Sequence, residues 1–168
     1  MLTRRDLIIK WSGYALISLA LILLDSLILR GVKLLGVYLF LPPLLVGVVA
    51  SLEETRSSVI FALVCGVLCD LTIAGTFPCV YTLSFTAAAL FCSLLARSVL
   101  QPGFFCSLAV TALTFVIVDA LNMLALGLGS GAAFMPMLVL ALSETAVSCL
   151  LLPVCHPVLV WLHRKFTL

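Results

Sequence analysis

The sequence predicts an all-α membrane protein, a compact bundle of six transmembrane helices. Its 168 residues are 64% hydrophobic and only 10% charged, whereas soluble domains are about half apolar and about a quarter charged. Apolar runs of about 20 residues, the length that crosses a bilayer, follow one another along the chain. The longest connection without apolar character, 53–58, spans only a few residues. The chain therefore has no room for a soluble catalytic domain.

Six spans are expected where apolar runs are separated by charged residues, glycine and proline. They form a single integral membrane domain covering residues 1–168, with spans at about 11–30, 34–52, 57–75, 78–96, 104–126 and 133–155. In the second span, Pro42 and Pro43 are expected to bend or break the helix, because proline has no backbone N–H. The break either shapes a cavity or only bends the helix. The first span is expected to be retained rather than cleaved as a signal peptide.

The basic residues predict the topology, because short cytoplasmic loops of membrane proteins carry an excess of Lys and Arg. With the amino terminus inside, the inner side holds Arg4, Arg5, Lys10, Arg56, Arg97, Arg164 and Lys165. The outer side holds only Arg30 and Lys33. Both termini are therefore expected in the cytoplasm, and the short connections at 75–77 and 127–132 are expected outside.

Four acidic residues lie inside apolar runs: Asp25, Asp70, Asp119 and Glu144. A carboxylate at the centre of a membrane helix costs about 2.5 kcal/mol or more, so each acid needs a partner, a wet cavity or a packed interface. Counting about 1.5 Å per residue along each span places the three aspartates in the outer half of the membrane and Glu144 near the middle. Arg30 and Lys33 lie at a comparable level and are the expected counter-ions. Structural and functional roles are both open for these acids.

Small residues recur four positions apart in the third and fourth spans, so each set shares one helix face. The third span carries Ser58, Ala62, Gly66 and Asp70, and the fourth carries Ser84, Ala88, Cys92 and Ala96. Small side chains let helix backbones approach closely in membranes. These two helices are therefore expected to pack together, with Asp70 turned toward protein rather than lipid. The seven cysteines are expected to be packing residues, and no metal site is expected.

The stretch from Gly66 to Asp70, Gly-Val-Leu-Cys-Asp, is followed by Gly75 and by a helix with Tyr81 and the alanines 87–89. This pattern resembles the MreD family of bacterial rod shape-determining membrane proteins. The basic amino terminus, the proline-bearing second span and an arginine closing the fourth span extend the resemblance over most of the chain in topology. The resemblance implies a fold similar to the substrate-binding components of energy-coupling-factor (ECF) transporters.

The resemblance also implies a non-enzymatic protein without cofactors, located in the bacterial inner (cytoplasmic) membrane. Its expected role is that of a subunit of the cell-elongation (rod) complex, which binds the MreC scaffold, a bitopic membrane protein. Through that scaffold it is expected to help couple MreB filaments to peptidoglycan synthesis by RodA and its transpeptidase. No nucleic-acid partner is expected, whereas contact with membrane lipid and a homodimer are both compatible with the sequence.

Two other functions fit parts of the sequence. An ECF-type component would bind a small vitamin or metal in a pocket lined by Asp25, Asp70, Asp119 and Asn122. Against this function, the first span lacks the Ala-x-x-x-Ala pattern of such docking helices. An intramembrane enzyme would use Asp70 and Asp119 as general acid and base, but neither aspartate has the flanks that a signal-peptidase motif requires. The candidate interaction or structural residues are therefore Asp70, Gly66, Asp25, Asp119, Asn122, Glu144, Arg30, Lys33, Pro42 and Pro43.

Overall fold

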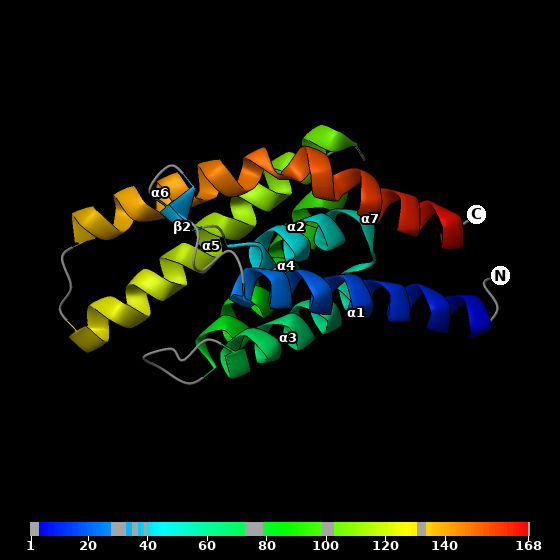
Figure 1. Ribbon diagram of the computed structural model, residues 1–168, viewed down its shortest axis with the longest axis horizontal. Coiled ribbons are helices and arrows are strands. Elements are labelled where there is room, and N and C mark those ends of the chain that lie inside the picture. The colour runs from blue at the N-terminus through cyan, green and yellow to red at the C-terminus, as the bar shows by residue number, and fades with distance from the viewer. Residues whose placement is uncertain are drawn as a thin grey trace.

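The computed structural model describes residues 4–27, 33–34, 37–38, 40–72, 79–98, 103–130 and 134–167. Within these ranges the chain is helical apart from two short paired strands and a few residues between helices (Figure 1). In chain order the elements are α1 (Arg4–Leu27), β1 (Lys33–Leu34), β2 (Val37–Tyr38), α2 (Pro42–Leu52), α3 (Thr55–Thr72), α4 (Val80–Ser98), α5 (Phe104–Ser130), α6 (Phe134–Leu150) and α7 (Leu152–Thr167). The prediction of a helical bundle is confirmed for this part of the chain.

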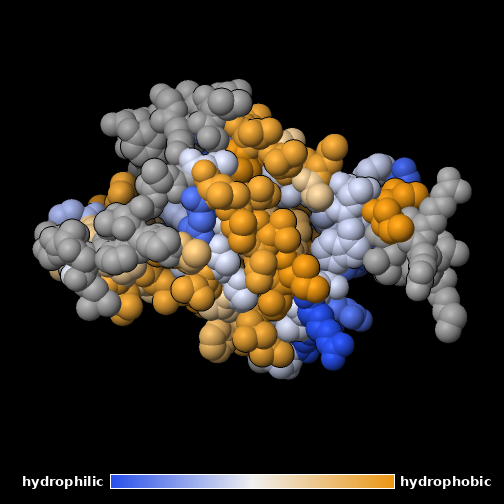
Figure 2. Space-filling model, turned by 90° about the horizontal axis from the view of Figure 1, so that it is seen from below, coloured by the Kyte–Doolittle hydropathy of each residue, from blue (hydrophilic) through white to orange (hydrophobic). Residues whose placement is uncertain are grey.

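Four helices of the described chain are long and apolar enough to cross a membrane: Ile8–Asp25 in α1, Thr55–Thr72 in α3, Val80–Ser98 in α4 and Phe104–Ala125 in α5. Helices α6 and α7, bent by 54° at the break between them, make a fifth if they cross together. Figure 2 shows a band of hydrophobic residues across the middle of the molecule, with hydrophilic residues on both sides of it. These are the features of a multi-pass membrane protein, although the predicted count of six spans is not confirmed.

The second predicted span, 34–52, is wrong in its first half. That region contains the strands β1 and β2, which pair antiparallel. Helix α2 begins only at Pro42 and has 11 residues, which make about 17 Å at 1.5 Å per residue. This length is about half of the hydrocarbon thickness. Pro42 and Pro43 do not kink or break a helix. They occupy its first turn, where a missing N–H leaves no intrahelical hydrogen bond unmade.

The sixth predicted span, 133–155, is divided in two. Helix α6 ends at Leu150 because Pro153, two residues into α7, has no N–H to continue the hydrogen-bond ladder. The Leu151 amide donates instead to the Ser148 carbonyl at 3.1 Å, a tight turn that marks the break. The prediction of one continuous sixth helix is therefore wrong.

The other four predicted spans each overlap a helix that is long and apolar enough to cross a membrane, with shifted ends. Helix α5 continues to Ser130, so Gly127 is helical and does not belong to the connection predicted at 127–132. The connection predicted at 75–77 lies outside the described residues. The start of α1 and the end of α7 lie side by side at one end of the molecule, and α5 and α6 extend beyond the other helices at the opposite end (Figure 1).

Helix α2 lies at the centre of the bundle. Every residue from Pro42 to Ala50 is buried, and α2 contacts α1, α3, α4, α5 and α7. A Cβ added to Gly47 would lie 2.7 Å from the Thr111 Cα of α5. Only glycine therefore lets these two backbones cross so closely. Large side chains from the surrounding helices fill the rest of the core: Tyr14, Phe61, Phe85, Phe115 and Val118.

Helices α3 and α4 make the most extensive helix–helix contact, as the small-residue stripes predict. A Cβ added to Gly66 would lie only 2.5 Å from the Thr82 Cα, so glycine sets how closely α3 and α4 approach. The second stripe is buried, but its C-terminal half, Cys92 and Ala96, packs against residues of α2 and α5 rather than α3. The Cys92 thiol donates to the Val110 carbonyl of α5 at 3.6 Å and accepts from the Thr114 hydroxyl at 3.4 Å. That part of the stripe packs α4 against α5 instead.

Gly66→Ala is expected to destabilise the bundle by about 1–3 kcal/mol, because the added methyl group meets backbone atoms that move only if α3 and α4 separate. Thermal unfolding in detergent measures the effect. Gly127→Ala is the matched control: it also lies in a helix, a Cβ there meets nothing within 4 Å, and its expected effect is neutral or stabilising by about 0.5–1 kcal/mol. Equal stability of the two variants would contradict the close α3–α4 approach.

Candidate functional site

Asp25, near the end of α1, holds the start of α2. Its carboxylate is 3% exposed and accepts a hydrogen bond from the Leu41 amide at 3.3 Å. Leu41 is the residue before α2, and the two prolines that follow have no N–H to satisfy. A carboxylate at this position also interacts favourably with the positive end of the helix dipole. Asp25, Pro42 and Pro43 therefore act together to reduce the number of unpaired N–H groups at this buried helix start.

Asp70, at the end of α3, holds the start of α4 in the same way. It accepts hydrogen bonds from the Tyr81 amide at 3.1 Å, the Thr82 amide at 2.9 Å and the Thr82 hydroxyl at 2.6 Å. Gly66, one turn earlier, lies against the same threonine. The prediction that Asp70 faces protein is confirmed, and the Gly-x-x-x-Asp pattern joins α3 to α4.

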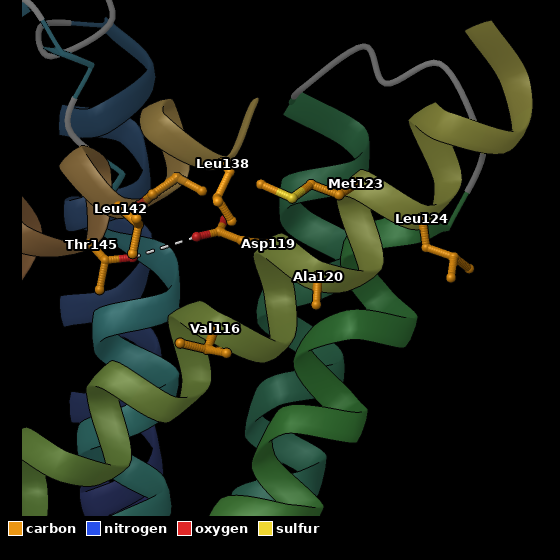
Figure 3. Close-up of a pocket in the computed structure, with 9 residues that line it drawn as sticks. Val116, Asp119, Ala120, Met123, Leu124, Leu138, Leu142 and Thr145 are labelled. Carbon is orange, nitrogen blue, oxygen red and sulfur yellow. Dashed lines mark hydrogen bonds between the residues drawn. The ribbon is translucent and has the colours of Figure 1, made fainter. Parts of the chain in front are cut away.

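Asp119 lies in the wall of a cavity of about 410 Å³ between α5 and α6 (Figure 3). In the described chain its hydrogen-bond partner is the Thr145 hydroxyl, at 3.5 Å from Oδ2. The rest of the cavity is lined mainly by aliphatic and thioether side chains: Val116, Ala120, Met123, Leu124, Leu138, Ala141 and Leu142. Several of these are exposed on the outside of the protein, including Leu142 at 62% and Val116 at 55%. The cavity is therefore an open apolar groove on the side of the bundle.

Glu144, also on α6, interacts electrostatically with both Asp119 and Asp25. The structure thus brings three of the four predicted acids into one region, whereas Asp70 is bound separately at the start of α4. Asn122 is half-buried and is not among the residues that line the groove.

The described residues do not test the pairing of the acids with the predicted counter-ions. Arg30 lies outside the described residues, and Lys33 is described only as a backbone residue of β1. Their pairing with the acids stays a prediction.

A second cluster centres on Glu53, in the turn between α2 and α3. Its Oε1 lies 2.6 Å from the Lys10 Nζ of α1 and 2.7 Å from the His163 Nδ1 of α7, and it accepts a hydrogen bond from the Tyr14 hydroxyl at 3.0 Å. The Glu53 backbone carbonyl accepts from the Arg97 guanidinium of α4 at 2.9 Å. Glu53 and Lys10 are only 7% and 6% exposed. One residue therefore ties together α1, α4, α7 and the end of α2.

The ionised form of Glu53 is stabilised by these contacts. Burial raises the pKa of Glu53, but the hydrogen bonds from Lys10 and His163, the Lys10 charge and the Tyr14 hydroxyl lower it more. The net result is a pKa below the usual value of 4.5.

Sequence patterns did not point to this cluster, because Glu53 belongs to a polar connection and Lys10 counted only toward topology. One signal was available. Lys10 lies one turn before Tyr14 on a largely apolar helix, so it shares a face with a residue that packs inward. A basic side chain on such a face needs an acid at the same depth. Glu53 fits, because the predicted topology places both Lys10 and the 53–58 connection on the cytoplasmic side.

Asp70 and Asp119, the two acids considered as a catalytic pair, have no partner in common. Asp70 binds the start of α4, and Asp119 lies in the groove between α5 and α6. Among the described residues, no group of three or more His, Cys, Asp or Glu side chains is arranged to hold a metal ion. The chemistry that this groove offers is apolar contact and hydrogen bonding to one carboxyl group.

Comparison with known proteins finds no family model, no curated protein and no solved structure that matches this chain. The resemblance to the MreD family therefore stays a prediction from the residues.

Glu53→Gln is expected to destabilise the protein by about 3 kcal/mol, because removing one partner of a buried ion pair leaves the Lys10 charge uncompensated. Thermal or chemical unfolding in detergent measures the loss. Glu54→Gln is the control, because this neighbouring acid is exposed and its substitution is expected to change stability by no more than about 0.5 kcal/mol. Equal effects at the two positions would remove Glu53 from the centre of the cluster.

The contribution of Glu53 is also expected to depend on pH. Because its pKa is lower in the folded state than the usual 4.5, its stabilisation is fully present above that usual value. The stabilisation is lost as the pH falls through the lower folded value. The difference in melting temperature between the parent and Glu53→Gln is expected to narrow as the pH falls below about 4.5. A difference that stays constant down to pH 3 would contradict this assignment.

Proposed function

We propose that this chain is a non-enzymatic membrane subunit of the bacterial cell-elongation complex, and that it binds a MreC-like bitopic protein. In this role it helps couple MreB filaments to peptidoglycan synthesis by RodA and its transpeptidase. The resemblance of the segment from Gly66 to Asp70 to the MreD family motivates the proposal. In the bundle this segment packs α3 against the start of α4. Such a structural role fits an adaptor protein, which binds partners and catalyses no reaction.

The observation that carries the proposal is the distribution of the acids. Asp25 and Asp70 hold helix starts, and Glu53 holds four helical elements together. Their carboxylates are therefore engaged in holding the bundle rather than available for reaction. Asp119 lies instead in an apolar groove that opens on the side of the bundle, where a partner helix in the membrane would approach.

The arrangement of the basic residues supports a cytoplasmic location for both termini. Lys10 and Arg97, counted on the inner side by the positive-inside rule, both contact Glu53. His163 of the last helix reaches the same residue. The start of α1 and the end of α7 also lie at one end of the molecule (Figure 1). A bacterial cytoplasmic membrane protein with both termini inside accounts for these features together.

The ECF transport function has less support. It expects Asp25, Asp70, Asp119 and Asn122 around one pocket, whereas only Asp119 lines the groove. Small-molecule sites are usually concave and mostly enclosed, with several convergent polar groups. A groove with one carboxyl group and exposed leucines fits a helix better than a vitamin.

Co-purification from native membranes tests the proposed function. The tagged chain is expected to recover a MreC-like single-pass protein at near-stoichiometric amounts, and a similarly tagged unrelated multi-pass protein is expected not to. Mass spectrometry of the two samples identifies the difference. Recovery of paired ATPases with a transmembrane coupling subunit, in place of the bitopic protein, would replace the elongation function with the transport function.

A further inference from the structure

The groove between α5 and α6 presents a large apolar surface to the outside of the protein. Leu124 and Leu142, from opposite walls, are each 62% exposed, and Leu138 is 36% exposed. The two helices extend together beyond the rest of the bundle, so no other described helix covers this part of them (Figure 1). In the part of the chain that the structure describes, the groove is therefore open to lipid or to another protein.

Asp119 distinguishes between these two surroundings. Thr145 has one hydroxyl proton, which it donates to the Ala141 carbonyl of its own helix at 2.9 Å. The contact of the same hydroxyl with Asp119, at 3.5 Å, lies at the limit of a hydrogen bond. Figure 3 shows the Asp119 side chain pointing across the groove toward α6, between Leu138 and Leu142. Among the described residues, Thr145 is thus a weak donor to Asp119, and a carboxyl group in an apolar groove is stabilised by a better one.

Three occupants can be compared by what they offer to Asp119. A lipid acyl chain would cover the leucines but would donate no hydrogen bond. In a two-fold dimer the same surface would meet itself. Asp119 and Glu144 already repel each other as like charges, and a dimer would bring two such pairs together. A transmembrane helix with a hydroxyl, amide or basic side chain in its apolar stretch would cover the leucines and also satisfy the carboxyl group.

We propose that the α5–α6 groove is the docking site for the transmembrane helix of the bitopic partner, with a hydrogen-bond donor of that helix bound to Asp119. This inference rests on the function proposed above, and it assigns the contact to one face of the bundle. The apolar walls supply contact area, and the carboxyl group fixes the depth and rotation of the partner helix. Interhelical hydrogen bonds have such a role in membranes.

Site-specific photo-cross-linking tests the location. A photoreactive amino acid replaces Leu124 or Leu142 in the full-length chain, which is co-expressed in native membranes with the epitope-tagged bitopic partner. Leu83 of α4 and Leu71 of α3 are the matched controls, because they are 69% and 78% exposed and lie outside the groove. The two groove positions are expected to form adducts with the partner helix, and the two control positions are not.

Two substitutions test the chemistry. Asp119→Leu is expected to lower the yield of the Leu142 adduct about three- to tenfold, the range of a single interhelical hydrogen bond. Asp119→Asn, which keeps an acceptor oxygen, is expected to lower it less. Ala120→Trp fills the groove from an exposed position and is expected to abolish the adduct while leaving the carboxyl group intact. Gel filtration of each variant shows that it is folded.

The outcomes separate the docking site from the proposed function. If the bitopic partner co-purifies but forms adducts only at Leu71 or Leu83, the docking site is wrong and the proposed function stands. Adducts between two copies of this chain at Leu142, or adducts with lipid alone, would also overturn the docking site. An undiminished yield from Asp119→Leu would do the same. If the bitopic partner does not co-purify at all, the proposed function itself fails.

Discussion

A short helix buried inside an apolar bundle is stable only if the backbone groups at its two ends find polar partners, because neither lipid nor apolar side chains can hydrogen-bond to them. Helix α2 is such a helix, and the other elements are arranged around its ends. At its start, Asp25 accepts from the last amide before the two prolines. At its end, the Ser58 hydroxyl donates to the Val49 carbonyl at 3.3 Å, and Arg97 donates to the Glu53 carbonyl. Helices α1, α3 and α4 therefore meet at the ends of α2 through polar contacts as well as packing.

The same constraint sorts the charged residues by role. Asp25, Asp70 and Glu53 each satisfy backbone amides or pair with a basic side chain, so their burial is compensated. Asp119 lies instead at an open groove with a marginal donor. In the described chain, the acids that bind helix starts or a basic side chain stabilise the bundle, and Asp119 is the acid whose position in an open groove leaves room for contact with another molecule.

Sequence patterns predicted the close packing of α3 and α4, because small residues four apart define a face whatever the rest of the fold does. They also predicted that Asp70 turns away from lipid. They could not predict that its partners are the Tyr81 and Thr82 amides. These amides lack an intrahelical acceptor only because α4 starts at Val80. The two prolines were misread for a related reason: their residue type indicates a helix boundary or a kink, and only the position of α2 distinguishes the two.

The amino-acid sequence alone was enough to predict that this protein folds in a membrane, and to predict the number of apolar helices to within one or two. Hydropathy and helix length depend on composition along a single segment, so they need no knowledge of neighbours. Tertiary structure decided which acids hold helices together and which one lies in a groove. That difference depends on contacts between residues far apart in the chain, such as Lys10 with Glu53 and Asp119 with Thr145, and no local pattern records them.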